Sequence, residues 1–82
     1  MMRWDYRVVR RQYDDSYGGR VTRYYIHEAY YDVGSTKPRS TTGEGIEPRG
    51  ETRDELRREL RAMLQALKKP VLDYGTREEV EE

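Results

Sequence analysis

The architecture of this chain follows mainly from residues 4–33, which read WDYRVVRRQYDDSYGGRVTRYYIHEAYYDV. In residues 4–13 the large side chains of Trp4, Tyr6 and Val8 alternate with more polar ones, as in a half-buried strand. Residues 14–19 have the composition of a turn, and the two glycines at its end tolerate positive φ. Residues 20–33 are again rich in tyrosine and β-branched residues. The stretch therefore predicts a β-hairpin.

A third strand is predicted over residues 39–48, which read RSTTGEGIEP. Serine and threonine suit an extended chain, whereas Gly43 and Gly45 weaken a strand or mark a bulge. We therefore expect this strand at an edge of the sheet.

A helix is predicted from Thr52 to Lys69. Thr52 and Glu55 have the spacing of a capping box, in which each side chain bonds a backbone N–H group at the helix start. Pro70 cannot continue a helix, so the helix must end before it. Apolar side chains recur at offsets 0, 4, 7, 8 and 11 and form one stripe: Leu56, Leu60, Met63, Leu64 and Leu67.

The two sides of this stripe differ in charge. At about 100° per residue, basic side chains fall along one flank (Arg57, Arg61 and Lys68). Glu55 and Glu59 fall along the other flank.

These elements predict an α+β fold in which a three-stranded antiparallel β-meander carries one C-terminal amphipathic helix packed on one face (β-β-β-α). Residues 1–74 are expected to form the single domain, with Val71 and Leu72 covering the edge of its core. Residues 75–82 are expected to be an acidic, disordered tail because they carry too little apolar surface to offset their ordering entropy.

The two faces of the second strand are expected to have different environments. Ile26 is its strongest central apolar residue, which favours the Ile26 face turning towards the helix. Glu28 shares that face and would need an arginine or tyrosine partner, because an unpaired buried carboxylate is costly. The face that carries His27 would then remain open.

Composition argues against catalysis. The chain has one histidine, no cysteine and a net charge of zero. His27 and the adjacent Glu28 point to opposite sides of a strand, so they cannot act as an acid–base pair. We found no nucleophile elbow, phosphate loop or metal-ligand cluster. We therefore expect a protein that is not an enzyme and that needs no cofactor, metal or small-molecule substrate.

The sequence gives no sign of a membrane segment. No apolar run approaches the roughly 20 residues that span a bilayer. The N-terminus lacks the apolar segment of a secretory signal. We expect a cytoplasmic protein.

The eight tyrosines indicate a contact surface on the open face of the sheet. The expected function is a non-catalytic protein-interaction module that self-associates, or binds a small protein, through residues Tyr25, His27, Tyr31, Arg7 and Arg11. Cross-strand aromatic pairs that only rigidify the sheet are the simpler interpretation. The alternative function is weak binding of RNA or single-stranded nucleic acid by the same tyrosines and arginines, although zero net charge makes a nucleic-acid partner a weaker expectation.

Three segments carry a resemblance to a family. The stretches WDYRVV, IHEAYYD and KPVLD resemble those of a group of short uncharacterised bacterial proteins, which implies a β-β-β-α domain without implying an activity. A looser similarity, through Gly50-Glu51-Thr52-Arg53-Asp54-Glu55, is to the N-terminal domain of HicB-type antitoxins. That similarity implies a fold without catalytic acids that binds a small toxin. The chain lacks that family's Pro-Gly-Cys-like segment and has no DNA-binding region after the helix.

Overall fold

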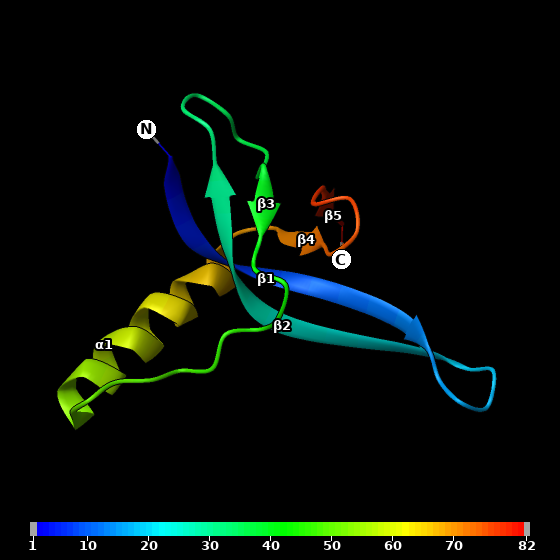
Figure 1. The fold of residues 1–82 in the computed structure, drawn as a ribbon, viewed down its shortest axis with the longest axis horizontal. Helices are drawn as coiled ribbons and strands as arrows, with labels where there is room; N and C mark the ends of the chain where they lie inside the picture. Colours follow the sequence, from blue (N-terminus) through cyan, green and yellow to red (C-terminus); the bar gives the residue numbers. More distant parts are fainter. Residues whose placement is uncertain (1, 82) are drawn as a thin grey trace.

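The computed structural model describes residues 2–81, in which five strands, one α-helix and one short 3-10 helix occur (Figure 1). In chain order the elements are β1 (Arg3–Asp14), β2 (Arg20–Tyr31), β3 (Ser40–Thr41), α1 (Arg53–Leu64), η1 (Gln65–Lys68), β4 (Val71–Asp73) and β5 (Glu79–Val80). The predicted hairpin and helix are confirmed.

The hairpin is the longest feature of the sheet. Strands β1 and β2 pair in antiparallel register from Arg3 opposite Tyr31 to Asp14 opposite Arg20. Their turn end projects beyond the other elements as a two-stranded arm (Figure 1). The arm contributes to the elongated extents of 43 × 33 × 21 Å.

The predicted three-stranded meander is wrong, because the sheet has five strands in the order β3-β2-β1-β4-β5 and is mixed. After the helix the chain returns beside β1 and runs parallel to it, with Val9 opposite Leu72. Residues 71 and 72 therefore do more than cover the edge of the core, since they extend the sheet.

A turn built around Asp73 adds the fifth strand. Its Oδ2 atom accepts hydrogen bonds from the backbone N–H groups of Thr76 at 2.9 Å and Gly75 at 3.0 Å. The Thr76 bond is the main reason that the pKa of Asp73 lies below its usual value. The turn reverses the chain so that Glu79–Val80 pairs with β4, within the segment that composition predicted to be disordered.

The predicted third strand is mostly irregular. Only Ser40–Thr41 qualifies as a strand, although residues 42–46 continue along β2. Backbone N–H groups of Thr42 and Ile46 donate to the carbonyls of Glu28 at 3.0 Å and Ile26 at 2.7 Å, respectively. The two glycines in between break the regular ladder, as expected at an edge.

The start of α1 is capped by the two predicted side chains, but Glu55 bonds the residue before the N-cap instead of Thr52 itself. Thr52 Oγ1 accepts from the backbone N–H of Glu55 at 3.1 Å. The Glu55 carboxylate in turn accepts from the backbone N–H of Glu51 at 2.8 Å. The α-helix ends at Leu64, and η1 then carries the chain to Pro70.

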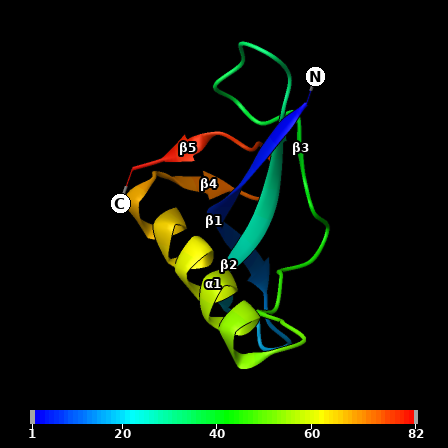
Figure 2. The same ribbon diagram turned by 90° about the vertical axis from the view of Figure 1, so that its left-hand side faces the viewer.

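Helix α1 meets the hairpin on the face that carries Tyr6, Ile26 and Glu28, the face that the sequence favoured. The Tyr6 hydroxyl donates to the Glu59 carboxylate of α1, and Tyr6 lies opposite Glu28 on that face. Figure 2 shows α1 in front of the strands on this side. Glu28 has the tyrosine partner it required, because the Tyr30 hydroxyl donates to it at 2.9 Å.

The opposite face of the hairpin is not open. The main apolar cluster lies there and consists of Val9, Ala29, Tyr31 and Leu72, with Tyr74 packed against it. His27 shares this face and is completely buried. The C-terminal segment that carries Leu72 and Tyr74 thus covers the surface that was expected to be free for a partner.

Candidate functional site

The most exposed apolar surface of α1 and η1 is a row of four leucines, Leu56, Leu60, Leu64 and Leu67, which we call the leucine face. Leu56 is half-buried, whereas Leu60, Leu64 and Leu67 are 48%, 59% and 67% exposed. The row follows one side of a helix at spacings of three and four residues. The leucine face therefore lacks a covering layer within the described chain.

The helix turns a different row towards the sheet. Met63 and Ala66 are buried, and Glu59 is half-buried against Tyr6. The prediction that the whole leucine stripe packs on the sheet is therefore wrong, and only its Met63 edge does so. The Tyr6 hydroxyl needs a polar partner, so this side of the sheet selects Glu59 rather than a leucine. In the sequence, the spacing of Glu59, Met63 and Ala66 at i, i+4 and i+7 was the only indication that this side of the helix faces the sheet.

The leucine face has a basic edge formed by Arg53, Arg57 and Arg61. Together with Leu56, Leu60 and Leu64 these arginines line a shallow groove of about 360 Å³. Arg57 forms an exposed ion pair with Asp54 at 3.6 Å. Arg53 and Arg61 form no ion pair with any residue between 2 and 81. The groove thus combines apolar surface with two arginines, Arg53 and Arg61, that have no ion-pair partner among residues 2–81.

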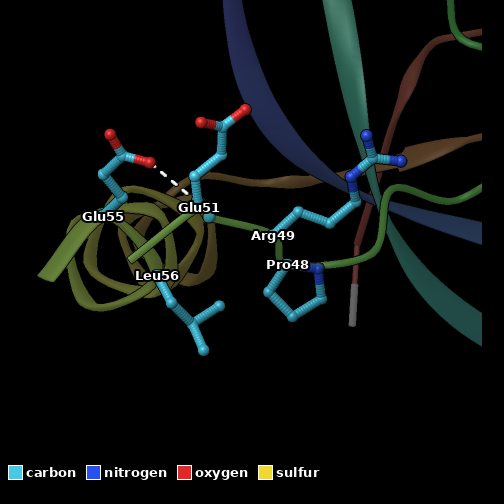
Figure 3. A pocket seen from close by; sticks show the side chains of 6 residues that line it. Pro48, Arg49, Glu51, Glu55 and Leu56 are labelled. Atoms are coloured by element: carbon cyan, nitrogen blue, oxygen red, sulfur yellow. Dashed lines mark hydrogen bonds between the residues drawn. The ribbon is translucent and has the colours of Figure 1, made fainter. Parts of the chain in front are cut away.

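A second groove lies at the beginning of α1. Its lining includes Pro48, Arg49, Glu51, Glu55 and Leu56 (Figure 3). The N-terminal end of a helix attracts anions, but here the capping carboxylate of Glu55 already occupies that position. A third groove contains Glu28, Glu47 and Glu59. Two of those carboxylates accept bonds from Tyr30 and Tyr6.

The two tyrosines that donate to these carboxylates, Tyr6 and Tyr30, have pKa values above the usual tyrosine value. Burial, reinforced by the bond to Glu59, raises the pKa of Tyr6. The bond to Glu28 raises the pKa of Tyr30. Two glutamates of this groove, Glu28 and Glu59, therefore have structural partners.

Residues 2–81 contain no group of three or more His, Cys, Asp or Glu side chains placed to hold a metal ion.

Three of the five residues predicted to bind a partner lie in the interior. Arg7, His27 and Tyr31 are all buried, so the prediction that they lie on an open face is wrong. They belong to the face that Leu72 and Tyr74 cover. A partner cannot reach these side chains in this structure.

Arg7 and Tyr31 instead form a polar network. The guanidinium of Arg7 donates to the Tyr31 hydroxyl at 2.8 Å and to the Pro70 carbonyl at 2.7 Å. The Tyr31 hydroxyl donates onward to Asp5 at 2.9 Å. Burial raises the pKa of Tyr31, so its hydroxyl retains the proton it donates. The network joins the hairpin to the junction between η1 and β4.

His27 is also held internally. Its Nδ1 atom lies 2.9 Å from the Thr42 carbonyl oxygen, which can only accept, so Nδ1 carries the proton. Nε2 is buried without a hydrogen-bond partner among the described residues. Burial lowers the pKa of His27 and favours the neutral ring. Its role here is to connect β2 with the segment after β3.

Tyr25 and Arg11 remain half-buried at the root of the arm. The Arg11 guanidinium stacks 4.1 Å from the centre of the Tyr74 ring and 5.9 Å from that of Tyr25. Arg11 also pairs with Glu44 at 3.7 Å. The structure thus brings Tyr25 and Arg11 together, but their neighbours are Tyr74 and Glu44 of this chain, and they do not lie on an open sheet face.

In the described part of the chain, no helix is long and apolar enough to cross a membrane. No protein-family model, curated protein or solved structure matches this chain.

Proposed function

We propose that this protein is a non-catalytic protein-interaction module that binds its partner through the leucine face of α1. The observation that carries the proposal is the exposure of Leu60 and Leu64 on α1 and of Leu67 on η1, each about half or more accessible on the same side of the helical segment. Single exposed leucines are common on protein surfaces, whereas a continuous row is typical of a contact site. The tyrosine-bearing sheet face, which was first expected to serve this role, is a less suitable surface because its central residues are buried.

The energetics support association with another protein. Burial of the exposed part of these three leucines stabilises a complex by roughly 3–5 kcal/mol, taking about 1.5–3 kcal/mol for a fully buried leucine. Association itself costs about 4–15 kcal/mol in lost translation and rotation. The leucine face is therefore an anchor that needs additional contacts from the same partner.

The absence of catalysis, a cytoplasmic location and a relationship to HicB-type domains are parts of this proposal that rest on the sequence. A HicB-type domain would bind a small toxin, which is one form of the proposed interaction. The exposed groove of the domain is lined by leucine and arginine side chains, which suit contacts with another protein and not catalysis.

Affinity capture from a lysate tests the proposal. The wild-type chain is compared with a Leu60→Asp, Leu64→Asp double variant and with Val33→Asp, a control at a 74% exposed apolar residue in a loop. We expect one protein to be captured by the wild type and by the control but lost with the double variant. Capture that is the same for all three chains, or capture by none, contradicts the proposal. Circular dichroism of each variant verifies that it is folded.

A second candidate function is weak binding of single-stranded nucleic acid. A hollow of about 370 Å³ at the arm is lined by Arg10, Arg11, Arg20, Tyr13 and Tyr74, among others. Arginine beside tyrosine suits phosphates and stacked bases. Filter binding with single-stranded RNA over a salt titration tests this function. No measurable affinity at low salt eliminates it, and an affinity that Arg20→Glu weakens supports it.

A further inference from the structure

We infer that the partner of the leucine face is an amphipathic helix whose apolar stripe is bordered by carboxylates. This inference rests on the proposed function and adds the chemical class of the partner. The leucine face with its basic edge is the structural feature that carries it.

The spacing of the leucine face suits a helical partner. Leu56, Leu60 and Leu64 form an i, i+4 ridge along α1. Such a ridge packs into the groove between the ridges of a second helix. The twelve residues of α1 span about 18 Å, which corresponds to about three turns of a facing helix.

The charge of the groove specifies the border of that helix. Arg53, Arg57 and Arg61 repeat at the same four-residue spacing as the leucines beside them. An aspartate or glutamate row at i, i+4 on the partner would face all three guanidinium groups. Arg53 and Arg61 have no competing ion pair with residues 2–81, and the Arg57–Asp54 pair is exposed and therefore weak.

A second copy of this chain fits the surface poorly. Two antiparallel copies of α1 would place one basic edge against the other, because equivalent flanks meet in that arrangement. Two parallel copies would place each basic edge against the opposite flank of α1. That flank is occupied by the chain's own sheet, through Glu59, Met63 and Ala66. Neither symmetric arrangement offers both space and charge complementarity.

A membrane surface is also a poorer match. A helix that lies in a bilayer interface exposes basic residues around its polar face and sinks its apolar side into lipid. Here one border of the leucine face is basic, and the other leads directly to Glu59 and the sheet. Insertion deep enough to bury the leucines would press that folded sheet against the lipid headgroups.

Fluorescence anisotropy with two synthetic peptides of about four helical turns tests the inference. Both peptides carry leucine in the same stripe, and the bordering positions are glutamate in one and lysine in the other. We expect the full chain to bind the glutamate peptide about ten- to a hundredfold more tightly than the lysine peptide, with affinity falling as salt rises. Arg53→Glu combined with Arg61→Glu should reverse this preference, and Leu60→Asp should abolish both interactions.

Arg58→Glu is the control, because it makes the same kind of substitution on α1, with half the charge change of the double variant, at an exposed residue that points away from the leucine face. It should leave the preference for the glutamate peptide intact. Equal affinity for both peptides, or tighter binding of the lysine peptide, overturns the inference. Failure to bind the glutamate peptide also overturns the inference. Light scattering and binding to phosphatidylglycerol vesicles then show whether the leucine face instead mediates dimerisation, contacts lipid or does neither.

The two proposals fail separately. If lysate capture depends on Leu60 and Leu64 but the glutamate peptide is not bound, the proposed function stands and the partner class is wrong. If capture also fails to depend on these leucines, both are wrong.

Discussion

Removal of one hydroxyl group, by Tyr31→Phe, should weaken this domain far more than its small size suggests. The ring of Tyr31 is buried, and its hydroxyl accepts from Arg7 at 2.8 Å while donating to Asp5 at 2.9 Å. Phenylalanine keeps the apolar ring and the contact with the Arg3 guanidinium, which lies 4.3 Å from the ring centre. The substitution therefore isolates the two hydrogen bonds.

The magnitude follows from what the two partners lose. Arg7 is itself buried, so the freed N–H group finds no water to replace the hydroxyl. A buried charged donor that loses its partner costs about 2–3 kcal/mol. At roughly 0.05–0.15 kcal/mol per residue, a chain of this length has a free energy of unfolding of about 4–12 kcal/mol. Tyr31→Phe should thus lower the melting temperature by roughly 10–20 °C.

Urea denaturation followed by circular dichroism measures this change as a shift of the midpoint at constant slope. Tyr17→Phe is the control, because Tyr17 lies in the hairpin turn and is 96% exposed. The control should change the free energy of unfolding by less than about 0.5 kcal/mol. A loss of less than about 0.5 kcal/mol for Tyr31→Phe as well would refute the structural role of the buried network.

Three further substitutions test the packing and the titration of the fold. Met63→Ala should lower the free energy of unfolding in urea by about 2–3 kcal/mol because Met63 is buried. Leu64→Ala, at an exposed position, should lower it by less than about 0.5 kcal/mol. Equal losses for the two variants would contradict the orientation of α1. Gly50→Ala should destabilise by about 1–3 kcal/mol because its Cβ would lie 2.4 Å from the Leu56 backbone nitrogen, and Gly43→Ala, with no atom within 4 Å of its Cβ, is the control. Because burial lowers the pKa of His27, the unfolded chain binds the proton more strongly, and stability should fall below about pH 6.5 with a slope of at most about 1.4 kcal/mol per pH unit. The variant His27→Gln should reduce that slope in denaturation curves recorded between acidic and neutral pH; an unchanged slope assigns it to other groups.

The local elements were predictable because their signals lie within short stretches of sequence. The alternation from Trp4 to Val8 and the turn before Arg20 predict the hairpin, and the observed register confirms it. Thr52 and Glu55 predict the start of the helix; Thr52 caps it as expected, and the Glu55 carboxylate accepts from the N–H of Glu51, one residue before the expected position. These features depend on neighbours a few residues apart, so no tertiary contact was needed to infer them.

The C-terminal strands were not predictable from local patterns. Val71–Asp73 is too short to show an alternation, and its place beside β1 depends on contacts with residues about sixty positions earlier, such as Val9. The turn at Asp73 then orders residues whose acidic composition indicates disorder. The C-terminal segment also packs over the face that carries His27. The sequence-based binding site required that face to be exposed, and it is buried.

The candidate site shows the same division. Leucine periodicity and the basic flank were evident from residues 53–68 alone, because the helical repeat determines which side chains share a face. Which side of the helix meets the sheet was decided by the half-buried Tyr6 hydroxyl, which bonds Glu59, and by the burial of Met63 and Ala66. An amphipathic pattern specifies that a helix has an apolar side, but only the three-dimensional arrangement of hydrogen-bonding partners determines whether that side turns inward or remains available to another protein.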